Sequence, residues 1–225
     1  MNLMLIDESE IVPINSTTLP SKFVAAAVEL DPNTRKAKHS GIVMKHDSTY
    51  KLFHFDGRLW FDDAPVNNWY FHKRLDFIKE EEIENFIAHC EIIKKESNPR
   101  YGFYYPGSHY DSTGQYFSKI PNTEFMTCVG LCLNTIKGFI EDDEYFRYTD
   151  WTIADNHMTM SFITDTIIGI RAANPTLSNV QIMEDIRRIL PDEYFASTYL
   201  KTMPIRKHEI DVIIDAVRIA LINKT

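Results

Sequence analysis

Apolar and polar residues change their spacing along this chain, and the change divides it into three sections. Between residues 22 and 60, short apolar runs alternate with turn-forming residues, which predicts antiparallel strands over residues 23–30, 39–44 and 50–55. Residues 80–95 carry apolar side chains at helical spacing, and a second apolar helix is expected from Cys128 to about residue 140. After residue 150 the pattern is mostly helical, so the fold class expected is α+β.

The last section contains clear helix boundaries. Ser178 precedes an apolar-periodic run that reaches Ile189, and Pro191 follows, which predicts one capped helix over this stretch. The same spacing over residues 207–222 predicts another helix. An aromatic-rich segment over residues 60–77 is expected to complete the core rather than to line a groove.

Composition narrows the class of protein. The chain has 225 residues, of which 44% are hydrophobic, enough for one sizeable core. Its net charge of −8 argues against a nucleic-acid partner. We expect no signal peptide and no membrane-spanning segment, because the start is acidic and no apolar run approaches about 20 residues. Three cysteines without a C-x-x-C pair indicate a reducing compartment, either the cytoplasm or a host cytoplasm into which the protein is delivered.

Cys128 is the residue most indicative of chemistry. It opens an apolar helix, and Thr127 before it is a suitable N-cap. The first turn of a helix offers free N–H groups and the positive end of the helix dipole, which favour a thiolate and can hold an oxyanion. Cys132 lies one turn deeper and Cys90 lies on the apolar stripe of another helix, so both are expected in the core. The sequence therefore predicts one nucleophilic cysteine.

Two histidines lie on the predicted strands upstream. If Met44 pairs with Thr49, His39 lies directly opposite His54 and the two rings share one face. One imidazole then orients the other and fixes the tautomer that accepts a proton from a thiol. A slip in register would give the orienting role to Asp56 instead. The histidine spacings match no metal motif and the chain has no nucleotide-binding glycine loop, so we expect no metal and no cofactor.

These residues carry a family resemblance. The segment His39-Ser40-Gly41-Ile42, followed on the next strand by Phe53-His54-Phe55, resembles the histidine hairpin of the NlpC/P60 superfamily of papain-like thiol enzymes. Because the histidines precede the cysteine, the order resembles the circularly permuted branch. That branch includes lecithin:retinol acyltransferase-like proteins, a poxvirus group and bacterial hydrolases of the YiiX type. The resemblance covers about residues 22–140.

The resemblance implies a site and a fold. Cys128 would be the nucleophile, His39 the general base and His54 the residue that orients it, with the Cys128 N–H in the oxyanion site. Tyr101 is a further candidate donor to the oxyanion. The implied fold is an antiparallel sheet packed on the cysteine-bearing helix. We expect this catalytic domain over residues 1–150 and a helical extension, packed on it, over residues 151–225.

Several functions are compatible with such a site. The first is a cysteine-dependent hydrolase or acyltransferase, of cysteine peptidase or amidase type, that cleaves an amide or ester bond through a thioester. Its substrate would be a peptide, a protein or a lipid. The alternative is a non-catalytic interaction protein on a papain-like scaffold, and a third hypothesis assigns the function to a partner-binding module in residues 150–225. The substrate, the choice between hydrolysis and transfer, and the oligomeric state do not follow from the sequence.

Overall fold

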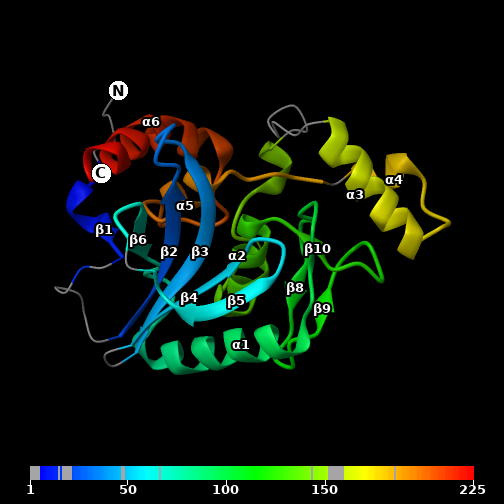
Figure 1. Cartoon of the computed structure of the whole chain (residues 1–225), viewed down its shortest axis with the longest axis horizontal. Helices are drawn as coiled ribbons and strands as arrows, with labels where there is room; N and C mark the ends of the chain where they lie inside the picture. Colours follow the sequence, from blue (N-terminus) through cyan, green and yellow to red (C-terminus); the bar gives the residue numbers. More distant parts are fainter. Residues whose placement is uncertain are drawn as a thin grey trace.

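The chain folds as an α+β structure in which helices surround a six-stranded antiparallel sheet (Figure 1). The structure is a computed structural model, and it describes residues 6–14, 16, 22–46, 49–65, 67–142, 144–151, 160–184 and 186–225. None of the helices in these ranges combines the length and the apolar character needed to cross a membrane.

The sheet has the strand order β1-β6-β2-β3-β4-β5. Its strands are β1 (Val12–Pro13), β2 (Phe23–Leu30), β3 (Ala37–His46), β4 (Thr49–Phe55), β5 (Leu59–Asp63) and β6 (Tyr70–Arg74). The three strands predicted from the sequence correspond to β2, β3 and β4. The aromatic-rich segment contributes β5 and β6, and its Phe71 is fully buried in the core, as expected for that segment.

The predicted register between β3 and β4 is wrong by two residues. The residue opposite His54 is Gly41, and His46 pairs with Thr49, whereas His39 pairs with Glu29 on β2. Side chains alternate between the two faces of a strand, so a shift by two residues keeps both histidines on the same face. His39 is therefore a diagonal neighbour of His54 rather than its direct partner.

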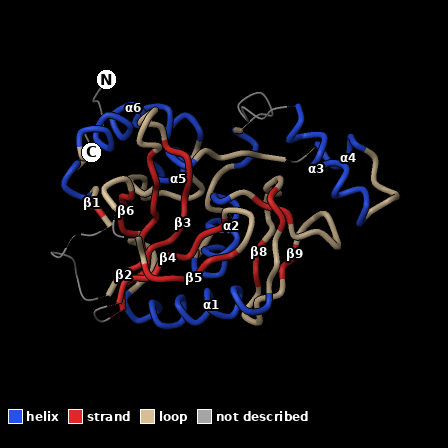
Figure 2. Tube along the Cα trace, in the orientation of Figure 1, coloured by secondary structure: helices blue, strands red, loops and turns tan. Residues whose placement is uncertain are grey.

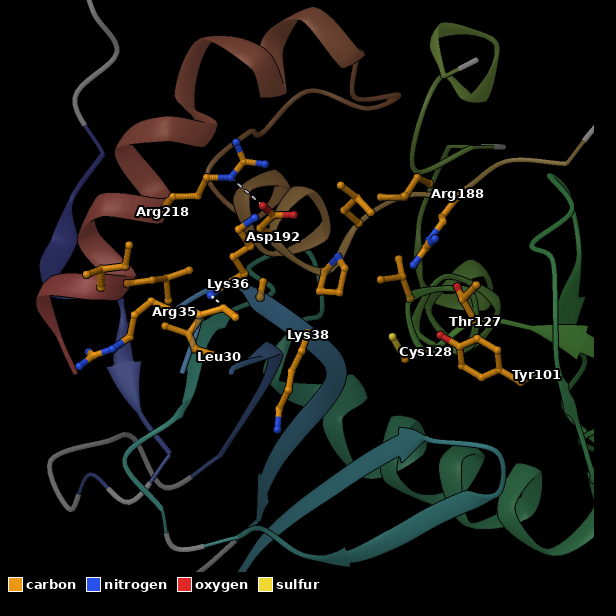
Figure 3. Close-up of a pocket in the computed structure, with 18 residues that line it drawn as sticks. Leu30, Arg35, Lys36, Lys38, Tyr101, Thr127, Cys128, Arg188, Asp192 and Arg218 are labelled. Carbon is orange, nitrogen blue, oxygen red and sulfur yellow. Dashed lines mark hydrogen bonds and ion pairs between the residues drawn. The ribbon is translucent and has the colours of Figure 1, made fainter. Parts of the chain in front are cut away.

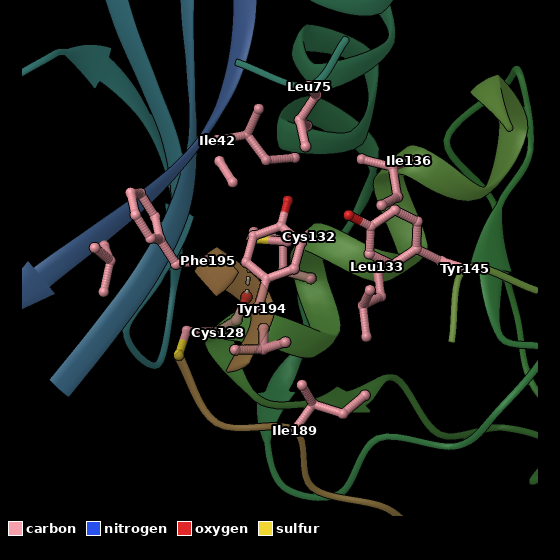
Figure 4. Packing of buried hydrophobic residues seen from close by; sticks show 14 of the residues in the cluster. Ile42, Leu75, Cys128, Cys132, Leu133, Ile136, Tyr145, Ile189, Tyr194 and Phe195 are labelled. Atoms are coloured by element: carbon pink, nitrogen blue, oxygen red, sulfur yellow. Dashed lines mark hydrogen bonds between the residues drawn. The ribbon is translucent and has the colours of Figure 1, made fainter. Parts of the chain in front are cut away.

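Four helices pack around the sheet. They are α1 (Ile83–Glu96), α2 (Cys128–Ile136), α5 (Pro191–Ser197) and α6 (Lys207–Asn223). Figure 1 shows α1 along one end of the sheet and α6 at the other, with α2 between sheet and the β8–β9 hairpin (His109–Tyr110 and Tyr116–Phe117). In Figure 4, α2 and α5 meet through Cys132, Leu133, Tyr194 and Phe195. Cys132 and Cys90 are both fully buried, as predicted.

The remaining helices form a smaller cluster away from the sheet (Figure 2). They are α3 (Met160–Ala173) and α4 (Asn179–Met183), which pack with Phe103, Tyr105, Ile120 and Phe125. Short 3-10 turns span Glu8–Glu10, Glu80–Glu82, Lys137–Phe139 and Tyr148–Asp150.

The sequence predicts one helix from Ser178 to Ile189, but the helix in the structure is shorter. Ser178 does cap α4, since its hydroxyl accepts from the Gln181 N–H, but α4 ends at Met183. The Arg187 N–H donates to the Tyr104 carbonyl at 3.1 Å in an isolated antiparallel bridge, and Ile189 is buried in the main core. The apolar residues after Met183 are therefore buried by an extended segment that crosses between the two clusters.

The main core draws on both halves of the chain. Tyr194, Phe195, Ile210 and Val217 from α5 and α6 belong to the same buried cluster as Ile42 of β3. Deleting residues 151–225 would consequently expose the apolar face of the sheet. The division into a catalytic part and an extension at residue 150 stays a prediction.

Candidate active site

Cys128 is the first residue of α2, and the sequence around it explains why the helix starts there. Thr127 has extended backbone angles (φ −94°, ψ 175°), and its hydroxyl accepts from the Gly130 N–H at 3.0 Å. This is the N-cap predicted from the sequence, and it satisfies one of the free donors of the first turn. The cap leaves the Cys128 thiol at the amino end of a buried helix.

The surroundings of the thiol act on its pKa in opposite directions. The backbone N–H groups of Ser40 and Val129, together with the charge of Arg188, lower the pKa of the thiol. Burial raises it and prevails, because only 5% of Cys128 is exposed. The start of the helix favours the thiolate, as expected, but burial outweighs it and holds the pKa of the thiol above its ordinary value.

His39 and His54 form a hydrogen-bonded pair. The His39 Nε2 lies 2.9 Å from the His54 Nδ1, and the rings are nearly perpendicular, at 82° with 5.0 Å between centroids. Gly41 makes this approach possible, because a Cβ at this position would lie 3.0 Å from the His54 Cβ and 2.9 Å from a Leu52 methyl group. The two histidines that the sequence singles out are thus brought together, in spite of the different register.

Both histidines are neutral at pH 7. Burial, and then the charge of the other ring, lowers the pKa of His39 to about 4, and burial also lowers the pKa of His54. The Asp56 carboxylate opposes both shifts. The Asp56 Oδ1 accepts from the Trp60 Nε1–H at 2.7 Å, whereas the His39 ring is hydrogen-bonded to His54. Trp60 in turn stacks on His54, with 6.3 Å between centroids and 14° between the rings.

The Cys128 side chain lines a pocket of about 710 Å³. Cys128, Thr127 and Tyr101 line one side of the pocket (Figure 3). His39 and His54 are not among the lining residues. The N–H of Ser40, the residue directly after His39, nevertheless lowers the pKa of Cys128, so the thiol lies between the pocket and the histidine-bearing strand.

Tyr101 reaches Cys128 through a short parallel pairing. Strands β7 (Arg100–Tyr101) and β10 (Phe125–Met126) place Tyr101 beside Met126, and the Gly102 N–H donates to the Met126 carbonyl at 2.9 Å. In Figure 3 the Tyr101 hydroxyl is turned toward Cys128. Burial and the neighbouring thiol raise the pKa of Tyr101, so the phenol keeps its proton and can donate it in a hydrogen bond.

Three contributors to this region were not predicted from the sequence. They are the Ser40 N–H, the Trp60 ring and the Arg188 guanidinium. Ser40 lies inside the histidine motif, which is the one local signal available. Trp60 and Arg188 carry no motif, and only the tertiary fold brings Arg188 near Cys128.

Within the ranges that the structure describes, no three or more His, Cys, Asp or Glu side chains are grouped so that they could hold a metal ion. Comparison of the chain with protein-family models, curated proteins and solved structures finds no match. The functional argument therefore depends on the geometry of the site itself.

Proposed function

We propose that this protein is a cysteine-dependent acyl-transfer enzyme of the papain-like, permuted NlpC/P60 type, with Cys128, His39 and His54 as its triad. The observation that carries the proposal is the position of the Cys128 thiol. It lies at the start of a capped helix, lines a large pocket and feels the N–H of Ser40, the residue next to His39, whose ring is hydrogen-bonded to His54.

The histidine pair supports a role for His39 as general base. When the His39 Nε2–H donates to the His54 Nδ1, the His39 Nδ1 is the unprotonated nitrogen that can accept a proton. Because His39 is neutral at pH 7, it is ready to accept the thiol proton. The Asp56 carboxylate favours the imidazolium that forms, since its charge raises the pKa of both rings.

The proposed reaction proceeds through a thioester. His39 takes the Cys128 proton as the sulfur attacks the carbonyl carbon of an amide or ester, which forms a C–S bond and an oxyanion. His39 then returns the proton to the leaving nitrogen or oxygen as its bond to carbon breaks. Water, or another nucleophile, attacks the thioester carbon while His39 takes its proton. The C–S bond then breaks, the acyl product leaves, and His39 returns the proton to the sulfur.

Two kinds of donor are available for the oxyanion. The backbone N–H groups of Val129 and Ser40 favour negative charge on the sulfur, since both lower its pKa, and such groups stabilise an oxyanion formed next to it. Tyr101 adds a protonated phenol on the pocket side. The cap of α2 fixes Val129, the pairing of β3 with β2 fixes Ser40, and the β7–β10 pairing fixes Tyr101, so these donors need no rearrangement as charge develops.

Acylation by p-nitrophenyl acetate tests the proposal. Wild-type protein should release p-nitrophenolate and carry one acetyl group on Cys128, mapped by peptide mass spectrometry. Cys128→Ala should abolish this adduct, and His39→Gln should slow its formation by about 100-fold or more. Cys90→Ala is the matched control, because Cys90 is fully buried in another helix, α1, and this variant should acylate as wild type does.

One observation favours the alternative of a non-catalytic interaction protein on a papain-like scaffold. Only 5% of Cys128 is exposed, and burial raises the pKa of its thiol. A folded protein in which Cys128 is not acetylated, or is acetylated no faster than Cys90, would favour this alternative.

A further inference from the structure

The pocket beside Cys128 is strongly cationic in a protein that is acidic as a whole. The chain has a net charge of −8, yet among the described residues that line this pocket five are basic and one is acidic. They are Arg35, Lys36, Lys38, Arg188 and Arg218, with Asp192 as the acid. Such a reversal of sign concentrates anions where the mechanism needs a substrate.

Arg218 and Lys38 are paired with acids among the described residues. Asp192 accepts from the Arg218 Nε at 2.7 Å, so the two form an ion pair within the wall of the pocket. Lys38 pairs with Glu29 at 3.0 Å, outside the lining. Arg188 is the cation that acts on the reacting groups, because its charge lowers the pKa of both Cys128 and Tyr101.

The fold directs Arg188 into the pocket. It lies in the extended segment between α4 and α5, where the Arg187 N–H is bound to the Tyr104 carbonyl and Ile189 is 3% exposed. With both neighbours held, the Arg188 side chain extends toward Cys128 and the Tyr101 hydroxyl (Figure 3). Its position is therefore set by the main-chain bridge and by the core.

Much of the remaining lining is apolar. Leu30, Val129, Ile189, Leu221 and Ile222 contribute aliphatic surface beside the cations. A pocket of about 710 Å³ with this lining suits a ligand of intermediate size that has an apolar part and a negative charge.

We propose that this pocket selects an anionic acyl substrate, whose carboxylate or phosphate is bound by Arg188 while its apolar part lies on Val129, Ile189 and Leu221. The inference rests on the proposed function, since it assumes that Cys128 is the attacking group. Carboxylate and phosphate share the chemistry that a guanidinium recognises, which is a pair of oxygens that accept two N–H donors.

Two alkylating reagents of nearly equal size test this preference. Iodoacetamide is neutral and iodoacetate is anionic, and each loses iodide as the Cys128 sulfur is alkylated. The quantity measured is the rate with iodoacetate divided by the rate with iodoacetamide, at Cys128, in folded protein and in urea. We expect this ratio to be about tenfold higher in the folded protein. It should fall as the ionic strength rises from about 0.01 M to about 1 M, because the Debye length shortens from about 30 Å to about 3 Å.

Variants identify the responsible charge. Arg188→Gln should lower the ratio by about fivefold, whereas the matched control Arg74→Gln should leave it unchanged, since Arg74 is exposed and does not line the pocket. The use of a ratio removes any general effect of the substitution on thiol reactivity.

Protection experiments separate the two anion classes. Octanoate and octyl phosphate should each slow labelling of Cys128 by iodoacetamide, the better protector indicating the preferred group, and octyltrimethylammonium should not. The inference is overturned if the ratio in folded protein equals that in urea, or if octyltrimethylammonium protects Cys128 as well as the anions do. The proposed function still stands in either case, provided that Cys128 is reactive. A folded protein in which Cys128 reacts with neither reagent overturns both.

Discussion

Replacing His72 with phenylalanine should remove a large part of the sensitivity of this protein to acid. His72 lies on β6 with 1% exposure, and neither of its ring nitrogens has a hydrogen-bond partner in the described part of the chain. Its ring stacks on Phe23 with 5.1 Å between centroids. Protonation would create an unpaired charge among apolar side chains, and burial accordingly lowers the pKa of His72 from 6.5 to about 4.

This lowered pKa links stability to pH. Between about pH 6.5 and pH 4 the unfolded chain binds a proton at His72 that the folded protein excludes. The contribution to the free energy of unfolding is therefore complete above about pH 6.5 and is lost as the pH falls toward 4. At about 1.4 kcal/mol per pH unit, the loss over this window is about 3 kcal/mol. Phenylalanine keeps the stacked ring but has no proton to bind.

Urea unfolding, followed by tryptophan fluorescence at pH 7 and at about pH 4.5, measures this difference. Wild type should lose about 2–3 kcal/mol more than His72→Phe between the two pH values. His39 also has a lowered pKa, but it is present in both proteins and cancels. His208→Phe, at an exposed position of α6, should lose as much stability as wild type. Equal losses in wild type and His72→Phe would refute the reasoning.

Three further substitutions probe the site. Gly41→Ala should destabilise the fold by about 1–3 kcal/mol in urea unfolding, and it should slow acetylation of Cys128 by separating the two histidines. Gly138→Ala is the control, because nothing lies within 4 Å of its new Cβ, and it should change neither the stability nor the acetylation rate. Thr127→Ala should cost about 1 kcal/mol in urea unfolding through loss of the N-cap, and Thr127→Ser should retain most of it. Asp56→Asn should lower the pKa of both histidines further, because the carboxylate raises them; unchanged NMR titrations would contradict this role.

The sequence predicts this fold best where one short segment determines the outcome. Strand β2 and helix α6 follow directly from apolar spacing, and the cap of α2 follows from Thr127. The pairing of β3 with β4 was predicted two residues out of register, because the ends of a hairpin depend on its turn as well as on its apolar pattern. The approach of His39 to His54 survives that error only because faces alternate with a period of two.

The features that were not predicted depend on distant parts of the chain. The amphipathic pattern after Ser178 continues to Ile189, but a main-chain bridge to Tyr104 draws the later residues into an extended segment. That segment carries Arg188 to the pocket. The pKa of Cys128 is a similar case, since the helix start is visible in the sequence whereas burial, which prevails, is a tertiary effect. The site chemistry thus depends on packing that local patterns do not encode.

The central claim is that Cys128 is a nucleophile whose proton is taken by His39. The most direct measurement is iodoacetamide labelling of the folded protein from about pH 5 to about pH 9, mapped to each cysteine, in wild type and His39→Gln. The account predicts that Cys128 is labelled faster than Cys90 and Cys132, and that His39→Gln slows its labelling near neutral pH by about 100-fold. Labelling of Cys128 only when the protein unfolds, or at the same rate in both proteins, would contradict the claim.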